Sequence, residues 1–250
     1  MRTPAEMMDL SGKVVVITGT SGGIGKGVAD RFCAAGASIV AQVRSGILGE
    51  LDGPSVTVRA DLTSQEGPAF VVGEAVSAFG RIDALINSAG IQSQSTLADL
   101  EDVEWAQMID TNVTAVHRLT RLVAAEMKDK GDGGAIVHIA SIEGSQPAPR
   151  HGHYATTKAA LIMHARAAAL EYGADGIRVN TVSPGLIDRP GLADDWPDGV
   201  ARWHAAAPLG RMGTPGDVGD ACVFLCSDLA RWVTGADLVV DGGALTLPAW

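Results

Sequence analysis

The stretch Lys13–Gly25, KVVVITGTSGGIG, joins an apolar run to a cluster of glycines. Residues 13–17 form a continuous β-branched run, which is typical of a strand buried on both faces. Glycines at 19, 23 and 25 let the backbone turn sharply and let a pyrophosphate approach main-chain N–H groups at a helix start. The stretch predicts a strand, a phosphate-binding turn and a helix over 23–35, although such a turn can also be only a tight connection.

The same order of strand, turn and helix recurs along the chain. Further strands are predicted at 38–43, 56–60, 84–86, 135–140, 177–184 and 236–240, and further helices at 64–79, 103–129, 154–172 and 215–226. Seven strands alternating with helices predict an α/β fold, a doubly wound parallel seven-stranded sheet with helices on both faces. No Pro/Gly-rich linker divides the chain, so residues 1–250 are expected to form one domain.

Composition narrows the possible functions. A net charge of −10 argues against binding to nucleic acid or to an anionic membrane surface. No run approaches the ~18 apolar residues of a membrane span, and the first thirteen residues, MRTPAEMMDLSGK, hold no apolar secretory stretch. We therefore expect a cytoplasmic protein. Cys33, Cys222 and Cys226 cannot build a disulfide framework and are expected on apolar helix faces.

Tyr154 and Lys158 stand four residues apart on a predicted helix and so share a face. A free phenol, with a pKa of about 10, is a poor base at neutral pH. A lysine ammonium beside it stabilises the phenolate and lowers that pKa, which would suit a general acid/base. By themselves the two residues would more often be an ordinary exposed helical pair, because pairs at this spacing are abundant.

Two further polar residues support a catalytic interpretation of that pair. Ser141 ends a predicted strand, at the sheet edge where ligands bind, and its hydroxyl can hydrogen-bond a substrate oxygen. Asn112 falls in the middle of a predicted helix, an unfavourable place for asparagine unless its side chain has a task. Together the four residues suit proton transfer to or from a substrate oxygen, which carbonyl reduction and alcohol oxidation both require.

The spacing of Gly19, Gly23 and Gly25 resembles the TGxxxGxG signature of the short-chain dehydrogenase/reductase family. The resemblance continues, in the family's order and at its usual spacings, through Asp61-Leu62, Asn87-Ser88-Ala89-Gly90, Asn112, Ser141, Tyr154-x-x-x-Lys158 and Pro184-Gly185. Ser88 departs from the family's second Asn, and Arg189 stands where relatives usually carry Thr. The resemblance implies a Rossmann-type dinucleotide-binding domain and an oxidoreductase that interconverts a secondary alcohol and a ketone.

The resemblance also implies roles for individual residues. Asn112, Ser141, Tyr154 and Lys158 are expected to be catalytic, with Lys158 also holding the nicotinamide ribose and Asn112 binding a water that links Lys158 to solvent. Residues expected to bind the cofactor are Gly19, Thr20, Ser21, Gly23, Ile24, Gly25, Arg44, Asp61, Leu62, Asn87, Ala89, Gly90, Tyr154, Lys158, Pro184, Gly185 and Ile187. No metal is expected, because His117, His138 and His164 show no metal-ligand spacing and are interpreted as structural.

The cofactor is expected to be NADP rather than NAD. Cofactors with a free ribose 2′-hydroxyl are usually held by an acidic residue at the end of the second strand. Val43 occupies that place here, and the next residue, Arg44, could pair with a 2′-phosphate. A solvated surface arginine is the alternative, and NAD remains the alternative cofactor.

The substrate is the least determined part of the prediction. The loop after Ser141 and the segment from Leu186 to about Gly210 carry many polar groups, which would suit a sugar, a sugar acid or another polar carbonyl compound. The alternatives are a 3-oxoacyl reductase acting on thioesters and a non-catalytic cofactor-binding regulatory protein. Enoyl reduction is disfavoured by the four-residue spacing of Tyr154 and Lys158.

Self-association is expected as well. The predicted helices 103–129 and 154–172 carry many small and apolar positions, among them Ala155, Ala159, Ala160 and Ala169. The resemblance implies a homotetramer built on these helices, and the apolar tail LTLPAW is expected to pack against a neighbouring subunit.

Overall fold

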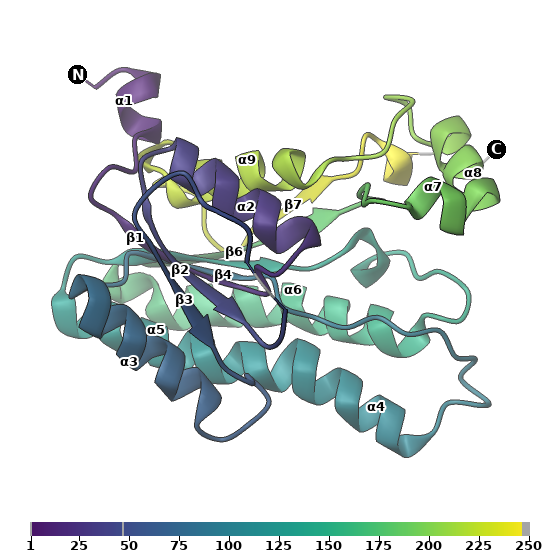
Figure 1. Ribbon diagram of the computed structural model, residues 1–250, viewed down its shortest axis with the longest axis horizontal. Helices are drawn as coiled ribbons and strands as arrows, with labels where there is room; N and C mark the ends of the chain where they lie inside the picture. Colours follow the sequence, from purple (N-terminus) through teal and green to yellow (C-terminus); the bar gives the residue numbers. More distant parts are fainter. Residues whose placement is uncertain (1, 47, 247–250) are drawn as a thin grey trace.

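The computed structural model describes residues 2–46 and 48–246. Its seven strands form one parallel sheet in the order β3-β2-β1-β4-β5-β6-β7 (Figure 1). They are β1 (Val14–Thr18), β2 (Ser38–Val43), β3 (Ser55–Arg59), β4 (Ala84–Asn87), β5 (Gly134–Ile139), β6 (Ile177–Pro184) and β7 (Asp237–Val240). Every predicted strand is present, and the predicted fold class is confirmed.

The direction of the strand order reverses between β1 and β4. From β1 the strands β2 and β3 follow toward one edge of the sheet, and from β4 the strands β5, β6 and β7 follow toward the other edge. Ile17 of β1 is level with Ala41 of β2 on one side and Ile86 of β4 on the other. The carboxyl ends of these strands diverge into connections on opposite faces of the sheet, which opens a crevice where ligands bind in such folds. The glycine turn after β1 lies at this point.

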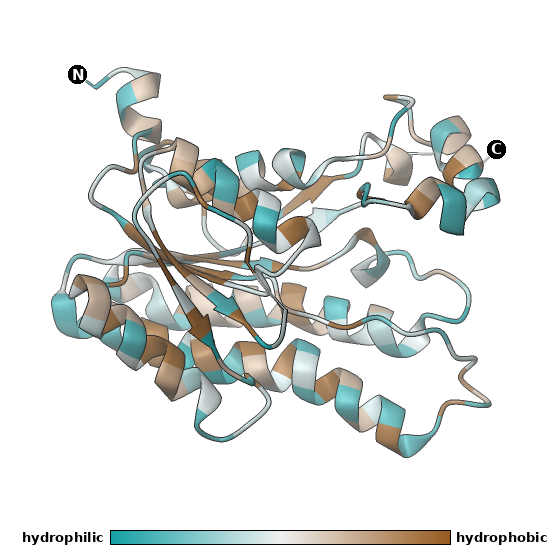
Figure 2. Ribbon diagram, in the orientation of Figure 1, coloured by the Kyte–Doolittle hydropathy of each residue, from teal (hydrophilic) through white to brown (hydrophobic). Residues whose placement is uncertain are grey.

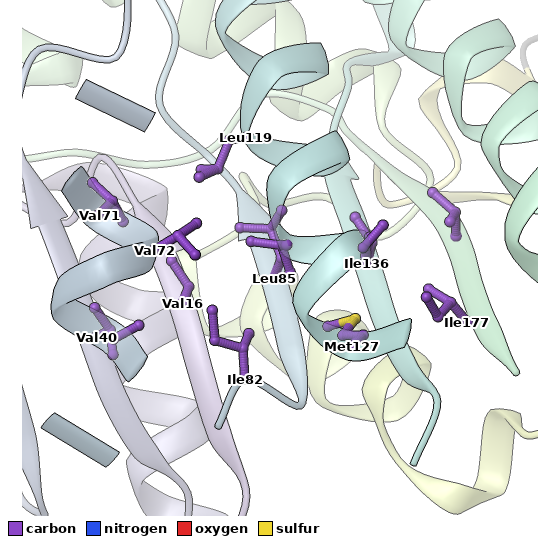
Figure 3. Close-up of a cluster of buried hydrophobic side chains, with 14 of the residues drawn as sticks. Val16, Val40, Val71, Val72, Ile82, Leu85, Leu119, Met127, Ile136 and Ile177 are labelled. Atoms are coloured by element: carbon purple, nitrogen blue, oxygen red, sulfur yellow. The ribbon is translucent and has the colours of Figure 1, made fainter. Parts of the chain in front are cut away.

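Helices cover both faces of the sheet. One face packs against α3 (Gly67–Phe79), α5 (Ala115–Lys130) and α6 (Gly152–Tyr172), through a core that includes Leu85, Leu119 and Ile136 (Figure 3). The other face packs against α2 (Gly23–Ala34) and α9 (Pro215–Cys226), which contact each other (Figure 1). Figure 2 shows the strands as predominantly apolar and the helices as mixed, as expected for a sheet covered on both faces.

The predicted long helix over 103–129 is present and runs without a break from Asp102 to Lys130, but its middle is wound differently from an α-helix. The structure divides it into α4 (Asp102–Ile109), a π-helical segment η1 (Asp110–Thr114) and α5. Short π-helical insertions often occur at functional sites, and this one contains Asn112, which is 1% exposed. The hydrophobic spacing survives the insertion, which is why the sequence pattern did not reveal it.

Three short helices were not predicted: α1 (Pro4–Met8), α7 (Leu192–Asp195) and α8 (Pro197–Ala206). The last two lie in the segment after β6 that was expected to border the substrate. In the part of the chain that the structure describes, no helix is long and apolar enough to span a membrane. Residues 247–250 of the tail LTLPAW lie outside the described residues.

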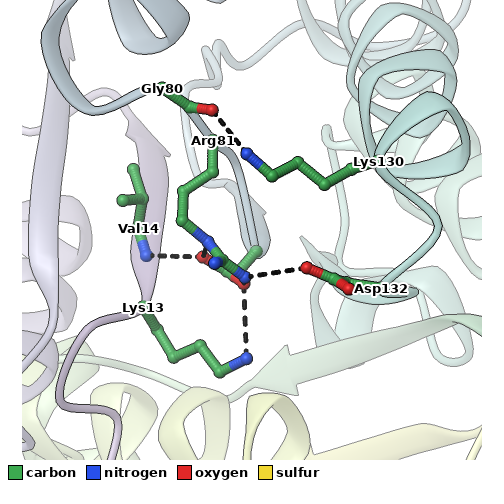
Figure 4. Close-up of polar contacts among 7 residues, drawn as sticks. Lys13, Val14, Gly80, Arg81, Lys130 and Asp132 are labelled. Carbon is green, nitrogen blue, oxygen red and sulfur yellow. Dashed lines mark hydrogen bonds and ion pairs between the residues drawn. The ribbon is translucent and has the colours of Figure 1, made fainter.

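At the amino ends of the strands, a buried carboxylate ties three parts of the chain together. Asp83 accepts hydrogen bonds from the backbone N–H of Val14 at 2.9 Å and from Nε of Arg81 at 2.8 Å. Lys13 Nζ lies 3.3 Å from the same carboxylate, and Arg81 also pairs with Asp132 (Figure 4). The cluster fixes the start of β1 against the start of β4, at the edge opposite the glycine turn.

Candidate active site

The glycine turn is held against the turn after β4. Gly19 has φ +72°, and a Cβ on it would lie 2.8 Å from the Cα of Ala89. A Cβ on Gly25 would overlap the carbonyl oxygen of Gly19. Both positions therefore exclude any larger residue, which explains two of the three glycines by packing rather than by flexibility alone.

Two polar side chains that the sequence analysis missed hold this turn in place. Gln42 accepts a hydrogen bond from Gly19 N at 3.0 Å and donates one to Ala60 O at 2.7 Å. Thr18 Oγ1 accepts hydrogen bonds from the N–H groups of Ser88 and Ala89, both at 2.9 Å. An amide within the apolar run SIVAQV was the available signal for Gln42, because a buried polar group needs partners.

Beside the turn lies a cleft of about 360 Å³. It is lined by residues from the carboxyl ends of β1, β2, β3 and β4. Nine of the predicted cofactor residues are among them: Gly19, Ser21, Ile24, Gly25, Arg44, Asp61, Leu62, Ala89 and Gly90. Gly23 instead borders an adjacent hollow together with Arg189 and Lys26, and Thr20 is buried with its hydroxyl donating to Gln42 O at 3.1 Å.

The end of β2 presents a cation to this cleft. Arg44 is exposed and lines the cleft, whereas Val43 is only 1% exposed. Asp61 lies opposite, where Thr63 donates two hydrogen bonds to its carboxylate at 2.7 and 2.9 Å. These bonds lower the pKa of Asp61, and Arg44 lowers it further. One cation and one carboxylate thus flank the same end of the cleft.

Tyr154 and Lys158 lie together on α6, and Lys158 Nζ is 5.4 Å from the centroid of the Tyr154 ring. Lys158 donates a hydrogen bond to Ile139 O, at the end of β5, at 2.8 Å. Burial lowers the pKa of Lys158 to about 8. Ser141, two residues beyond Ile139, is 8% exposed and accepts a hydrogen bond from Glu143 N at 3.1 Å.

The expected lowering of the Tyr154 pKa is not found in the protein alone. Burial raises that pKa to about 12, a hydrogen bond with Ser141 opposes the rise, and the charge of Glu143 adds to it. Desolvation of the phenolate outweighs any stabilisation from nearby Lys158, whose own charge is disfavoured by burial. The phenol is therefore a proton donor at neutral pH.

The side chain of Asn112 clamps the loop after β4. Its Oδ1 accepts from Ile91 N at 2.9 Å, and its Nδ2 donates to Ile91 O at 2.9 Å and to Thr157 Oγ1 at 3.1 Å. A Cβ on Gly90 would lie 3.2 Å from Asn112 Oδ1 and 3.7 Å from Lys158 Nζ. The π-helical segment thus delivers Asn112 to the same place as Lys158, with its carboxamide fully engaged.

Comparison with known proteins agrees with this geometry. A family model described as enoyl-(acyl carrier protein) reductase matches residues 19–245. The chain is 36% identical to 3beta-hydroxysteroid dehydrogenase 1 of Eggerthella lenta, over 97% of both chains. It is 35% identical to an NADP-dependent (R)-specific alcohol dehydrogenase of Lentilactobacillus kefiri, over 94% of this chain and 97% of the relative.

A solved structure completes the comparison. A short-chain type dehydrogenase/reductase from Mycobacterium marinum superimposes with a TM-score of 0.90 and 35% identity, covering 97% of this chain and 99% of that one. The chain belongs to the short-chain dehydrogenase/reductase family. It is accordingly an oxidoreductase that acts on CH–OH groups with a nicotinamide cofactor.

The remaining predicted cofactor residues of this short-chain dehydrogenase/reductase are not among the residues that line the cleft. Asn87 is 3% exposed and turns its amide away from the cleft, toward Thr120. Pro184 and Gly185 end β6, and a Cβ on Gly185 would lie 2.5 Å from the Trp203 ring. Ile187 is partly buried and bridges to Gly213.

Arg189, the departure from the family pattern, pairs with Asp195 of α7 at 2.8 Å. It also borders the hollow next to Gly22 and Gly23, at the start of α2. A cation at a helix N-terminus that presents free N–H groups adds to a field that favours anions. This position suits a phosphate contact better than a contact with the carboxamide.

A hydrogen-bonded pair of a histidine and a glutamate beside Tyr154 was not predicted. His151 Nδ1 lies 2.9 Å from one carboxylate oxygen of Glu143 and 3.1 Å from the other. The His151 ring stands edge-on to the Tyr154 ring, with centroids 6.2 Å apart. Arg150, the residue before it, has φ 68°. Sequence spacing could not show this pair, because a loop of irregular shape brings the two residues together.

Proposed function

We propose that this chain interconverts a secondary alcohol and a ketone, with Tyr154 as the general acid/base. The observation that supports this most directly is the cluster of Ser141, Tyr154 and Lys158 at the carboxyl end of β5, on the same sheet edge as the glycine cleft. The bound nicotinamide would supply hydride to the carbonyl carbon or accept it from the alcohol.

The protein side chains would handle the charge on the substrate oxygen. During reduction, Tyr154 donates its proton to the oxygen as negative charge develops there, and the Ser141 hydroxyl donates a hydrogen bond to the same atom. Oxidation runs the same proton transfer in reverse. Lys158, charged below a pKa of about 8, lowers the cost of forming the phenolate and would hold the ribose. A family model described as an enoyl reductase does not require reduction of a C=C bond, because the residues present suit an oxygen-centred proton transfer.

NADP is proposed as the preferred cofactor. Arg44 lines the cleft, and the buried Val43 leaves no carboxylate at the end of β2 for a free ribose 2′-hydroxyl. The Lentilactobacillus kefiri relative is named as NADP-dependent. Asp61, on the other side of the cleft, would contact the adenine.

The substrate is proposed to be polar, such as a sugar or sugar acid. The pair Glu143–His151 adjoins Tyr154, and the segment after β6, which was expected to border the substrate, carries Asp194, Asp195 and Trp196. Polar groups at a substrate site discriminate hydroxyl-bearing substrates strongly. A 3-oxoacyl thioester is the second candidate, and a non-catalytic role is disfavoured because all four catalytic side chains are present.

A homotetramer is proposed from exposed apolar side chains on two helices. Val103 of α4 and Leu170 of α6 are 73% and 86% exposed, and Met163 of α6 is 59% exposed. Ala155 and Ala169, expected to face a partner, are instead 7% and 8% exposed within the subunit. Sedimentation at micromolar concentration tests the proposal, and a monomer would contradict it.

A cytoplasmic location also stays a prediction.

One assay tests the proposed reaction. Purified protein is incubated with a panel of sugars, sugar acids, simple alcohols and 3-oxoacyl thioesters, each with NADP and NAD or their reduced forms, and nicotinamide absorbance is followed. Turnover of an alcohol or ketone supports the proposal. Binding of the cofactor without turnover of any panel member would favour the regulatory alternative.

A further inference from the structure

The hollow that Arg189 borders is continuous with the cofactor cleft. It has a volume of about 430 Å³, and its walls are α2, the start of α9 and the segment 188–190. Gly22, the residue before α2, lines both the hollow and the cleft. A pyrophosphate bound at the start of α2 would therefore lie where the two spaces meet.

The start of α2 is suited to an anion. Gly22 is the N-cap residue, and in the part of the chain that the structure describes no side chain caps this helix. The first turn carries no acidic side chain. The first N–H groups of α2 thus point outward without a side-chain acceptor, and the helix dipole adds a positive potential at the same place.

The charges around the hollow leave a specific task for Arg189. Lys26 pairs with Asp30 within α2, and Arg31 pairs with an aspartate of α9. Asp188 also lines the hollow, and its negative charge opposes an incoming anion. Arg189 is the neighbouring residue, and its positive charge can offset that of Asp188.

The backbone before Arg189 is held in place, whereas its side chain is held only weakly. Ile187 bridges to Gly213, and the N–H of Asp188 donates to Gly213 O at 2.8 Å. The Arg189 side chain is 51% exposed, and its Nη2 lies 2.8 Å from a carboxylate oxygen of Asp195, which is 59% exposed. Exposed ion pairs contribute little stability because solvent screens them. The guanidinium can therefore exchange this partner for another anion at little cost.

We propose that Arg189 binds the pyrophosphate of the nicotinamide cofactor, and that it leaves its ion pair with Asp195 to do so. The proposal rests on the use of the glycine cleft by a nicotinamide cofactor. It depends neither on the choice between NADP and NAD nor on the role of Tyr154.

The chemistry of the two anions explains the exchange. A guanidinium presents planar N–H donors that match a phosphate as well as a carboxylate, so both anions compete for the same donors. The carboxylate of Asp195 and the pyrophosphate would also repel each other if both stayed close to Arg189. Asp195 belongs to α7, in the segment expected to border the substrate. Cofactor binding would therefore release α7 from one of its contacts.

The first test is a calorimetric titration with NADP, NAD and ADP-ribose on the full chain. ADP-ribose keeps the adenosine, the pyrophosphate and the second ribose but lacks the nicotinamide. We expect Arg189→Ala to weaken binding of all three by a similar factor, roughly tenfold. Arg189→Lys keeps the charge without the planar donors and should lose less. Arg231→Ala, at an exposed position near the amino ends of the strands, is the matched control and should change none of the three.

A second variant tests the exchange with Asp195. Asp195→Asn removes the competing charge and keeps the shape, so it should tighten ADP-ribose binding by up to roughly fivefold. The same substitution made in Arg189→Ala should have no effect, because Asp195 is proposed to act through Arg189. Asp194→Asn, the adjacent acidic residue of α7, removes an equal charge and should change the affinity little.

Each other outcome contradicts a specific step. If Arg189→Ala weakens NADP and NAD but not ADP-ribose, Arg189 contacts the nicotinamide and the inference is overturned. Unchanged affinity for all three would overturn it as well. If Asp195→Asn weakens binding, or tightens it equally without Arg189, the exchange is wrong. An unmodified protein that binds none of the three would overturn the inference together with the use of the cleft. Failure to turn over any alcohol or ketone would contradict only the proposed reaction.

Discussion

Lys158 holds its ammonium group 5.4 Å from the centre of the Tyr154 ring while donating a hydrogen bond to Ile139 O. The phenol and the amine are thus fixed to the end of β5, beside Ser141. Both groups are buried, which raises the pKa of Tyr154 to about 12 and lowers that of Lys158 to about 8. Burial therefore moves the two values apart, from ordinary values of 10.0 and 10.5, so both groups favour their neutral forms and the phenol gives up its proton less readily than it would in water.

The first prediction concerns the pH dependence of the two reaction directions. Alcohol oxidation needs Tyr154 as phenolate, and its raised pKa means that this form grows as pH rises. We expect kcat/KM for oxidation to rise steadily from about pH 6 to about pH 10, whereas reduction, which needs the protonated phenol, should not rise. Initial rates in both directions measure this. An oxidation optimum on the acid side of neutrality would contradict it.

The second prediction concerns cofactor choice. Arg44→Ala should weaken NADP binding by about 1.5–3 kcal/mol, the range for hydrogen bonds to charged groups, which is roughly tenfold or more in affinity. NAD binding should change little, because that cofactor has no group at this position. Arg44→Asp should move the preference toward NAD by repelling the phosphate. The buried Val43 is unsuitable for an introduced carboxylate.

Titration of both cofactors against each variant measures the ratio of affinities. Arg166→Ala, at an exposed position of α6, serves as the control for removing a surface cation. If Arg44→Ala lowers the affinity for both cofactors equally or leaves both affinities unchanged, Arg44 does not bind the 2′-phosphate.

The third prediction concerns acid stability. Asp83 lies among Arg81, Lys13 and the N–H of Val14, and these interactions hold its pKa below the ordinary value despite its burial. A carboxyl group whose pKa is lower in the folded than in the unfolded protein stabilises the fold at pH values above the unfolded pKa of about 3.9. This stabilisation is lost as the pH falls through the pKa of the folded protein. Asp83→Asn should therefore lower the free energy of unfolding by about 1–3 kcal/mol near neutral pH.

Urea unfolding at neutral and acidic pH, at one fixed protein concentration, measures this contribution. The gap between the unmodified protein and Asp83→Asn should shrink below about pH 4. Asp129→Asn, at an exposed position of α5, should change stability by less than about 0.5 kcal/mol. A gap that is constant with pH would show that the carboxylate charge does not matter.

The strands were predictable because they are short apolar runs bounded by glycine turns, as at Val14–Thr18. The π-helical segment around Asn112 was not, because inserting it leaves the apolar positions of α4 and α5 on compatible faces. The motif residues could be found through spacing along the chain. Glu143 and the contact between His138 and His164 could not, since they depend on which loops, strands and helices lie side by side.

The central claim is that Tyr154 performs the proton transfer. Tyr154→Phe keeps the ring and removes the only phenol at the cluster, and Tyr172→Phe, at the other end of α6, is a matched control for the only other tyrosine. The decisive measurement is single-substrate turnover with saturating cofactor, alongside cofactor affinity. We expect Tyr154→Phe to lower turnover by a factor of ~10² or more with little change in cofactor affinity, and Tyr172→Phe to retain full turnover. Retention of most of the turnover in Tyr154→Phe would contradict the account.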